Sequence, residues 1–172
     1  MKKLIVLIMI LICAVSLNAQ TTYEKIDTIS KSKNQIYSDT KMYIAENWKS
    51  AQNVIQNDNK EDGLILIKGT IGLDVGKGLK QFIYNYSYTV KFYMKDNKYK
   101  ILIDNINPDY NQYNSTMFLS PPICENCEFP GVSKAGMYKD TWLELQSKFP
   151  LKMKEILISY DKYLRSNFKM DF

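Results

Sequence analysis

The sequence contains no histidine, and its only arginine is Arg165. Histidine is the usual general base, the usual partner of a catalytic serine or cysteine, and the commonest zinc ligand. Its absence argues against most catalytic classes. The near absence of arginine argues against nucleic acid as a partner, because the arginine fork reads phosphate and guanine. The formal net charge of +5 includes Lys2 and Lys3, which lie in the leader described below. No lysine cluster replaces the missing arginines.

Cysteine is almost as scarce, since the chain has only Cys13, Cys124 and Cys127. Cys13 lies in an apolar run near the N-terminus, and lipidation there would need a small residue where the chain has Ile12. A lipid anchor is therefore disfavoured. The two remaining thiols cannot complete a tetrahedral zinc site without histidine. We expect no metal and no cofactor.

Long apolar runs are also missing, apart from residues 4–15. Two lysines precede this run, and residues 16–19 follow it and end in a small residue, Ala19. The run is shorter than the roughly 18 to 20 residues that span a bilayer, and the order of the three parts is typical of a secretory signal. We predict a cleaved signal peptide over residues 1–19, a mature chain that begins at Gln20, and a periplasmic or secreted location without stable membrane insertion.

Residues 20–172 contain no repeat and no clear linker, and we expect a single α+β domain. The alternation in residues 21–30 predicts a first strand, with Tyr23 and Ile26 as inward residues. Residues 51–56 and 64–73 flank a polar cluster that ends in glycine, which predicts two strands of a hairpin.

Residues 81–95 give the clearest pattern, because apolar and polar side chains alternate along the whole segment. This period of two predicts a long strand with one buried face and one solvated face. Asp96 and Asn97 fit a two-residue turn that leads into a further strand over residues 98–106. The expected buried residues are Phe82, Tyr84, Tyr86, Tyr88, Val90, Phe92 and Met94.

A helix is predicted over residues 32–50, because Ser32 and Gln35 have the spacing of a capping box. Its expected apolar stripe consists of Tyr37, Ile44, Ala45 and Trp48.

A long C-terminal helix is predicted over residues 150–168. Residues 139–149 are expected to form a separate helical piece, with Asp140 as its cap and a kink at Pro150. The stripe of the C-terminal helix consists of Met153, Ile156, Leu157, Tyr160, Leu164 and Phe168. An antiparallel sheet with one apolar face and two amphipathic helices must bury these surfaces together, so both helices should cover one face of the sheet.

One combined pattern in the chain consists of Tyr37, Trp48, Val54-Ile55-Gln56, Glu61-Asp62-Gly63 and Ile67-Lys68-Gly69-Thr70. In this pattern the chain resembles a family of exported Bacteroidetes proteins of the DUF4468 type, a domain of unknown function with a TBP-like fold. The resemblance covers about residues 30–107. It implies a curved antiparallel sheet with helices across one face, and it implies no activity, because fold does not carry function. A loop over about residues 108–140 lies outside it.

The segment PPICENCEFP, residues 121–130, carries the two remaining cysteines. A redox dithiol usually needs a helix N-terminus to lower the pKa of its first thiol, but prolines flank this pair on both sides. Glu125 and Glu128 add negative charge, which disfavours a thiolate. We therefore predict a structural disulfide between Cys124 and Cys127.

Two classes of function are consistent with these features. The first is an exported, non-catalytic module that binds a protein, a glycan or an envelope component through the open face of the sheet or the loop over residues 108–140. The second is a thiol-disulfide oxidoreductase that uses Cys124 and Cys127. The ligand-binding residues of the first class are not identified by the sequence.

Titration of free thiols in the denatured mature protein, purified from an oxidising compartment, tests the predicted disulfide. We expect no reactive thiol, because Cys13 leaves with the signal peptide and the other two cysteines are bonded. After reduction two thiols should react. Two reactive thiols before reduction would show that the bond does not form.

Overall fold

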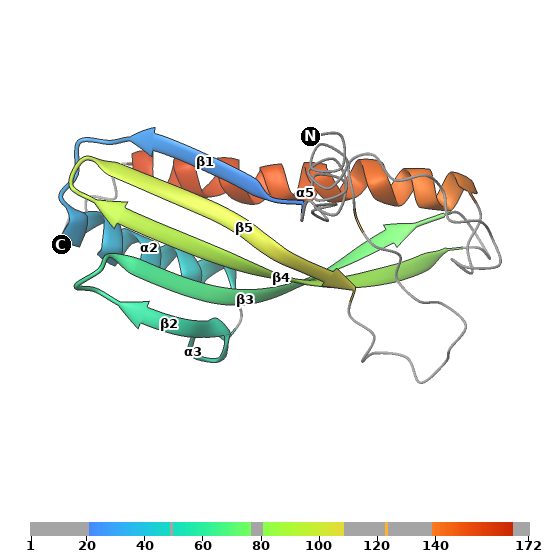
Figure 1. Ribbon diagram of the computed structural model, residues 1–172, viewed down its shortest axis with the longest axis horizontal. Coiled ribbons are helices and arrows are strands. Elements are labelled where there is room, and N and C mark those ends of the chain that lie inside the picture. Colours follow the sequence, from blue (N-terminus) through green and yellow to red (C-terminus); the bar gives the residue numbers. More distant parts are fainter. Residues whose placement is uncertain (1–20, 49, 77–80, 109–122, 124–138, 167–172) are drawn as a thin grey trace, which may run out of the picture.

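The computed structural model describes residues 21–48, 50–76, 81–108, 123 and 139–166. They form a five-stranded antiparallel sheet in the order β1-β5-β4-β3-β2, with the helices α2 and α5 on one of its faces (Figure 1). The predicted α+β class is confirmed. The elements are β1 (Tyr23–Thr28), α2 (Lys33–Asn47), α3 (Ala51–Val54), β2 (Ile55–Asn59), β3 (Leu64–Val75), β4 (Phe82–Lys95), β5 (Lys98–Pro108) and α5 (Lys139–Arg165).

The alternation predicted for residues 81–95 is confirmed in β4, where alternate side chains from Tyr84 to Met94 are buried under the helices. The turn at Asp96 and Asn97 is also confirmed, since Lys95 pairs with Lys98 and Asn97 has a φ of 60°. The hairpin of β2 and β3 closes at Gly63, whose φ of 64° suits a residue without Cβ.

β3 and β4 continue beyond their neighbours, and this asymmetry shapes the molecule (Figure 1). β3 pairs with β4 from Leu64 to Val75, whereas it pairs with β2 only from Leu64 to Ile67. Most of β3 therefore lies at an edge of the sheet.

One prediction for β1 is wrong, namely that Ile26 points inward. Tyr23 is buried, but Ile26 is 51% exposed on the other face of the sheet. The physical reason is the period of two along a strand, which places residues three apart on opposite faces.

The capping box that begins α2 is confirmed, because Ser32 Oγ accepts from the amide of Gln35 and Gln35 Oε1 accepts from the amide of Ser32. The predicted stripe of this helix is wrong in part. The buried residues are Ile36, Thr40, Tyr43 and Ile44, whereas Ala45 is exposed. The sequence pattern missed this buried face because it includes a polar residue, Thr40. Its hydroxyl is buried there through a 2.8 Å hydrogen bond with the Tyr160 hydroxyl.

α5 is one continuous helix with Pro150 inside it, so the two separate helical pieces expected from the sequence are a single element. Proline normally kinks or breaks a helix interior because it removes a hydrogen bond and its ring clashes with the preceding turn. Here the apolar stripe keeps its helical spacing across the proline, and burial of this stripe on the sheet offsets that cost. The buried residues of α5 are Trp142, Leu145, Phe149, Met153, Leu157, Tyr160 and Leu164. Phe168, assigned to the stripe from the sequence, lies outside the described residues.

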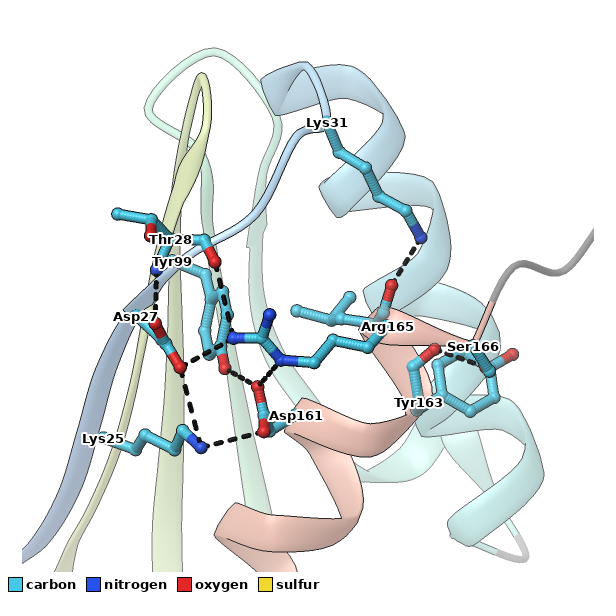
Figure 2. Close-up of polar contacts among 10 residues, drawn as sticks. Lys25, Asp27, Thr28, Lys31, Tyr99, Asp161, Tyr163, Arg165 and Ser166 are labelled. Atoms are coloured by element: carbon cyan, nitrogen blue, oxygen red, sulfur yellow. Dashed lines mark hydrogen bonds and ion pairs between the residues drawn. The ribbon is translucent and has the colours of Figure 1, made fainter.

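Arg165 ties the C-terminal end of α5 to the sheet (Figure 2). Its Nη2 lies 2.7 Å from Asp27 Oδ2 in β1, and its Nε lies 2.7 Å from Asp161 Oδ1. Lys25 Nζ lies 2.8 Å from Asp161 Oδ2, and the Tyr99 hydroxyl donates to the same carboxylate. These contacts hold β1, β5 and α5 together at one end of the molecule.

Burial alone would raise the pKa of Asp161, but hydrogen bonds from Lys25, Tyr99 and Arg165 outweigh it and lower the pKa to about 2. A carboxyl whose pKa is lower in the folded state stabilises the fold above its unfolded pKa, and this contribution is lost as the pH falls towards the folded pKa.

We expect the free energy of unfolding to fall more in the natural protein than in Asp161→Asn between about pH 6 and about pH 2.5. The difference should be on the order of 1 kcal/mol after screening by solvent. Urea unfolding at the two pH values measures it. The substitution removes the titrating group and, at both pH values, its ion pairs to Lys25 and Arg165. Equal losses in both proteins would show that Asp161 does not stabilise the fold through its charge.

Candidate binding cleft

A cleft of about 600 Å³ opens on the helix-covered side of the sheet, where α2 ends and α5 continues alone. A second hollow of about 560 Å³ adjoins it along α5 and shares four lining residues with it. The residues of the first cleft are Tyr43, Asn47, Trp48, Thr70, Ile71, Tyr88, Lys152, Glu155, Ile156 and Ser159. We call this surface the Trp48 cleft.

The floor of the Trp48 cleft depends on a glycine. Tyr88 of β4 pairs with Gly69 of β3, and its ring lies directly over the glycine backbone. A Cβ at position 69 would lie only 2.5 Å from Cζ of Tyr88, so no other residue leaves room for this ring. Burial raises the pKa of the Tyr88 hydroxyl, while the neighbouring Trp48 side chain acts in the opposite direction.

Trp48 is the C-terminal capping residue of α2. Its amide still donates to the carbonyl of Ile44 at 3.0 Å, but its own backbone is extended, with φ of −120° and ψ of 117°. The indole packs edge-on against Tyr43 with ring centroids 5.7 Å apart. It therefore forms a half-buried wall beside the floor.

The rim of the cleft is polar and carries both signs of charge. On α5, Lys152 Nζ lies 2.7 Å from Glu155 Oε2, and on α2, Asn47 donates to the carbonyl of Tyr43. An apolar, aromatic floor inside a polar rim is the usual composition of a binding site. The paired charges of Lys152 and Glu155 leave the rim without a strong net charge.

The opposite face of the sheet, which the sequence indicated as a possible binding surface, carries cross-strand ion pairs beside the exposed apolar side chains of Ile26, Ile83 and Tyr93. Lys91 lies 2.5 Å from Asp104, and Lys100 lies 2.7 Å from Glu24. Its hollow near the β4–β5 turn measures about 240 Å³. This hollow has less than half the volume of the Trp48 cleft, so the cleft is the larger candidate site.

Cys124 and Cys127 lie outside the described residues, as does nearly all of the loop over residues 108–140. Within the described part of the chain, no three His, Cys, Asp or Glu side chains are grouped to hold a metal ion. None of the helices there has the length and apolar content to cross a membrane.

The sequence reasoning missed the Trp48 cleft because its walls are far apart in the chain. One signal was available, since Gly69 interrupts an otherwise apolar face of a strand. A glycine inside a strand often marks a place where another group approaches the backbone closely.

The sheet order, the two helices on one face and the open edges define an α+β protein with a TBP-like fold. A TBP-like protein from Parabacteroides distasonis shares this fold, with a TM-score of 0.66, 17% sequence identity, and coverage of 90% of this chain and 98% of that one. Residues 23–108, half of the chain, match the family described as a domain of unknown function (DUF4468) with TBP-like fold, and the chain belongs to this family. The resemblance noted in the sequence is thereby confirmed.

A DUF4468 family protein from Bacteroides ovatus is similar at 18% identity, with a TM-score of 0.49. That match covers 56% of this chain and 60% of the other. No curated protein matches the sequence.

The Gly69→Ala substitution should destabilise the protein by about 1 to 2 kcal/mol, because the added methyl group forces the Tyr88 ring out of its place. Gly72→Ala is the matched control. Its Cβ would meet Asn85 Oδ1 and Ile83 Cγ2 at 3.0 Å, and both are ends of side chains. We expect a cost below about 0.5 kcal/mol there. Urea unfolding measures both, and equal costs would contradict the role given to Gly69.

Proposed function

We propose that this protein is an exported, non-catalytic module that binds a protein, a glycan or another envelope component in the Trp48 cleft. The observation that supports this proposal is the cleft itself, which is lined by the half-buried Trp48 indole and by Tyr88 of the core. Aromatic side chains supply large contact area at low conformational cost, which is why they are enriched where proteins bind partners.

Export is supported by the leader over residues 1–19, which has the charged start, the apolar run and the small final residue of a secretory signal. The proposed location is the periplasm or the exterior, with Gln20 as the first residue of the mature chain.

The experiment compares retention of envelope components on immobilised mature protein in three forms. These are the natural chain, Trp48→Ala in the cleft, and Ile26→Ala, the matched control on the opposite face of the sheet, where Ile26 is 51% exposed. Each form is first shown to be folded by its thermal unfolding curve. We expect a component that is retained by the natural chain and by Ile26→Ala and is lost with Trp48→Ala, because the indole forms one wall of the cleft.

Loss with Ile26→Ala but not with Trp48→Ala would move the binding surface to the other face and contradict the proposal. A protein that retains nothing would contradict it as well.

A further inference from the structure

The edge of β3 beside the Trp48 cleft has backbone groups that are directed away from the sheet. Met94 donates to the carbonyl of Gly63 at 2.8 Å, so these two residues form a hydrogen-bonded pair. In an antiparallel ladder such pairs alternate with pairs whose amide and carbonyl groups point outward. The register of β3 and β4 then means that the backbone amide and carbonyl groups of Gly69, Ile71 and Leu73 bond to β4.

Lys68, Thr70 and Gly72 consequently direct their amide and carbonyl groups to the edge. The hairpin of β4 and β5 gives the same phase independently, because residues on either side of a two-residue turn form a hydrogen-bonded pair. That pair is Lys95 and Lys98. The odd-numbered residues of β4 therefore direct their backbone amide and carbonyl groups towards β5, and the even-numbered residues direct theirs towards β3.

Among the described residues, no strand pairs with this edge between Lys68 and Gly72. β2 pairs with β3 only as far as Ile67, and the residues before β2 form the short helix α3, which contacts β3 but does not pair with it as a strand. Beyond Gly72 the edge is closed again, since Lys148 Nζ donates to the carbonyl of Asp74 at 2.8 Å. The free edge is therefore a slot of five residues, roughly 16 Å long at the usual rise of a strand.

The two edges of the sheet differ in the contacts that cover them. At the β1 edge, Arg165 reaches the carbonyl of Thr28 at 3.4 Å and bonds to Asp27 (Figure 2). Long, unpaired strand edges are normally covered or shortened because they bind other strands. Along the free part of β3, Lys68, Thr70 and Gly72 are exposed to solvent.

We propose that an extended segment of a partner protein binds as a sixth strand along Lys68–Gly72, with side chains in the Trp48 cleft. The proposal rests on the binding function proposed above and names its ligand class. Thr70 and Ile71 line the cleft, so the slot and the cleft are one continuous surface. Repeating amide and carbonyl groups at strand spacing are matched by a peptide backbone, which is the basis of strand addition.

The pairing also sets the sequence pattern of the partner segment. Its residues opposite Gly69 and Ile71 point to the helix side, into the cleft, because side chains opposite each other share a face of the sheet. They should be apolar or aromatic. Its residue opposite Lys68 points to the other face and should be acidic or polar, since opposite charges across a pair are favourable.

A library of random linear peptides, displayed and selected on the mature protein, provides the probe. Recovered peptides are titrated against the natural chain, Thr70→Pro and Thr70→Val. Proline removes the outward amide, and it is tolerated on an edge strand because no bond within the sheet is lost. Valine keeps the amide and changes only the side chain. We expect Thr70→Pro to bind the peptides roughly tenfold or more weakly than Thr70→Val does, because only the proline variant lacks the outward amide.

If Thr70→Pro does not fold, amide shifts of the natural chain on adding a recovered peptide replace it, and the largest should lie at Lys68, Thr70 and Gly72. Peptides that bind with Trp48-dependent but proline-insensitive affinity, or shifts confined to the helices, would overturn strand addition and leave the binding function intact. A library without binders would overturn strand addition too, and a glycan retained through Trp48 would then keep the binding function. A dimer held by two β3 edges, detected by sedimentation, would also overturn it.

Discussion

The packing of α5 against the tyrosine-rich face of the sheet is the interaction on which the rest of the structure depends. At its centre the ring of Tyr160 lies 4.9 Å from Phe92, 5.2 Å from Tyr43 and 5.4 Å from Tyr99, measured between centroids. Its hydroxyl is fully buried and bonds to Thr40 at 2.8 Å. One side chain thus joins both helices to two strands. A buried hydroxyl without such a partner would be costly, so Thr40 stabilises this packing together with the rings.

The same packing explains where the molecule stays open. α5 has 27 residues and follows the long strands of the sheet, whereas α2 has 15 and ends at the middle of them (Figure 1). Past the end of α2, the sheet is covered by one helix instead of two, and the Trp48 cleft occupies this gap. β2 begins at Ile55 on the adjacent edge and does not extend along the rest of β3. The uncovered face and the unpaired edge therefore meet at β3, and a partner that uses both would complete the sheet and fill the gap.

Much of the fold follows from the sequence, because its strongest patterns are local. The alternation in β4, the capping box of α2 and the turn at Asp96 and Asn97 each depend on neighbours in the chain. The errors fall where tertiary packing decides. Pro150 remains in a helix because the sheet holds the stripe on both sides of it, and the buried Thr40 depends on a tyrosine 120 residues away. The cleft and the free edge could not be predicted, since both arise from differences in length between elements that meet only in the fold.

Hydrogen exchange of single backbone amides in the free protein shows directly whether the β3 edge over Lys68–Gly72 is unpaired. An amide that bonds within the sheet exchanges slowly, whereas one directed to solvent exchanges fast. We expect fast exchange at Lys68, Thr70 and Gly72 and slow exchange at Gly69 and Ile71, which is an alternation within a single strand. Uniformly slow exchange across these five residues would contradict it, because the edge would then already be paired.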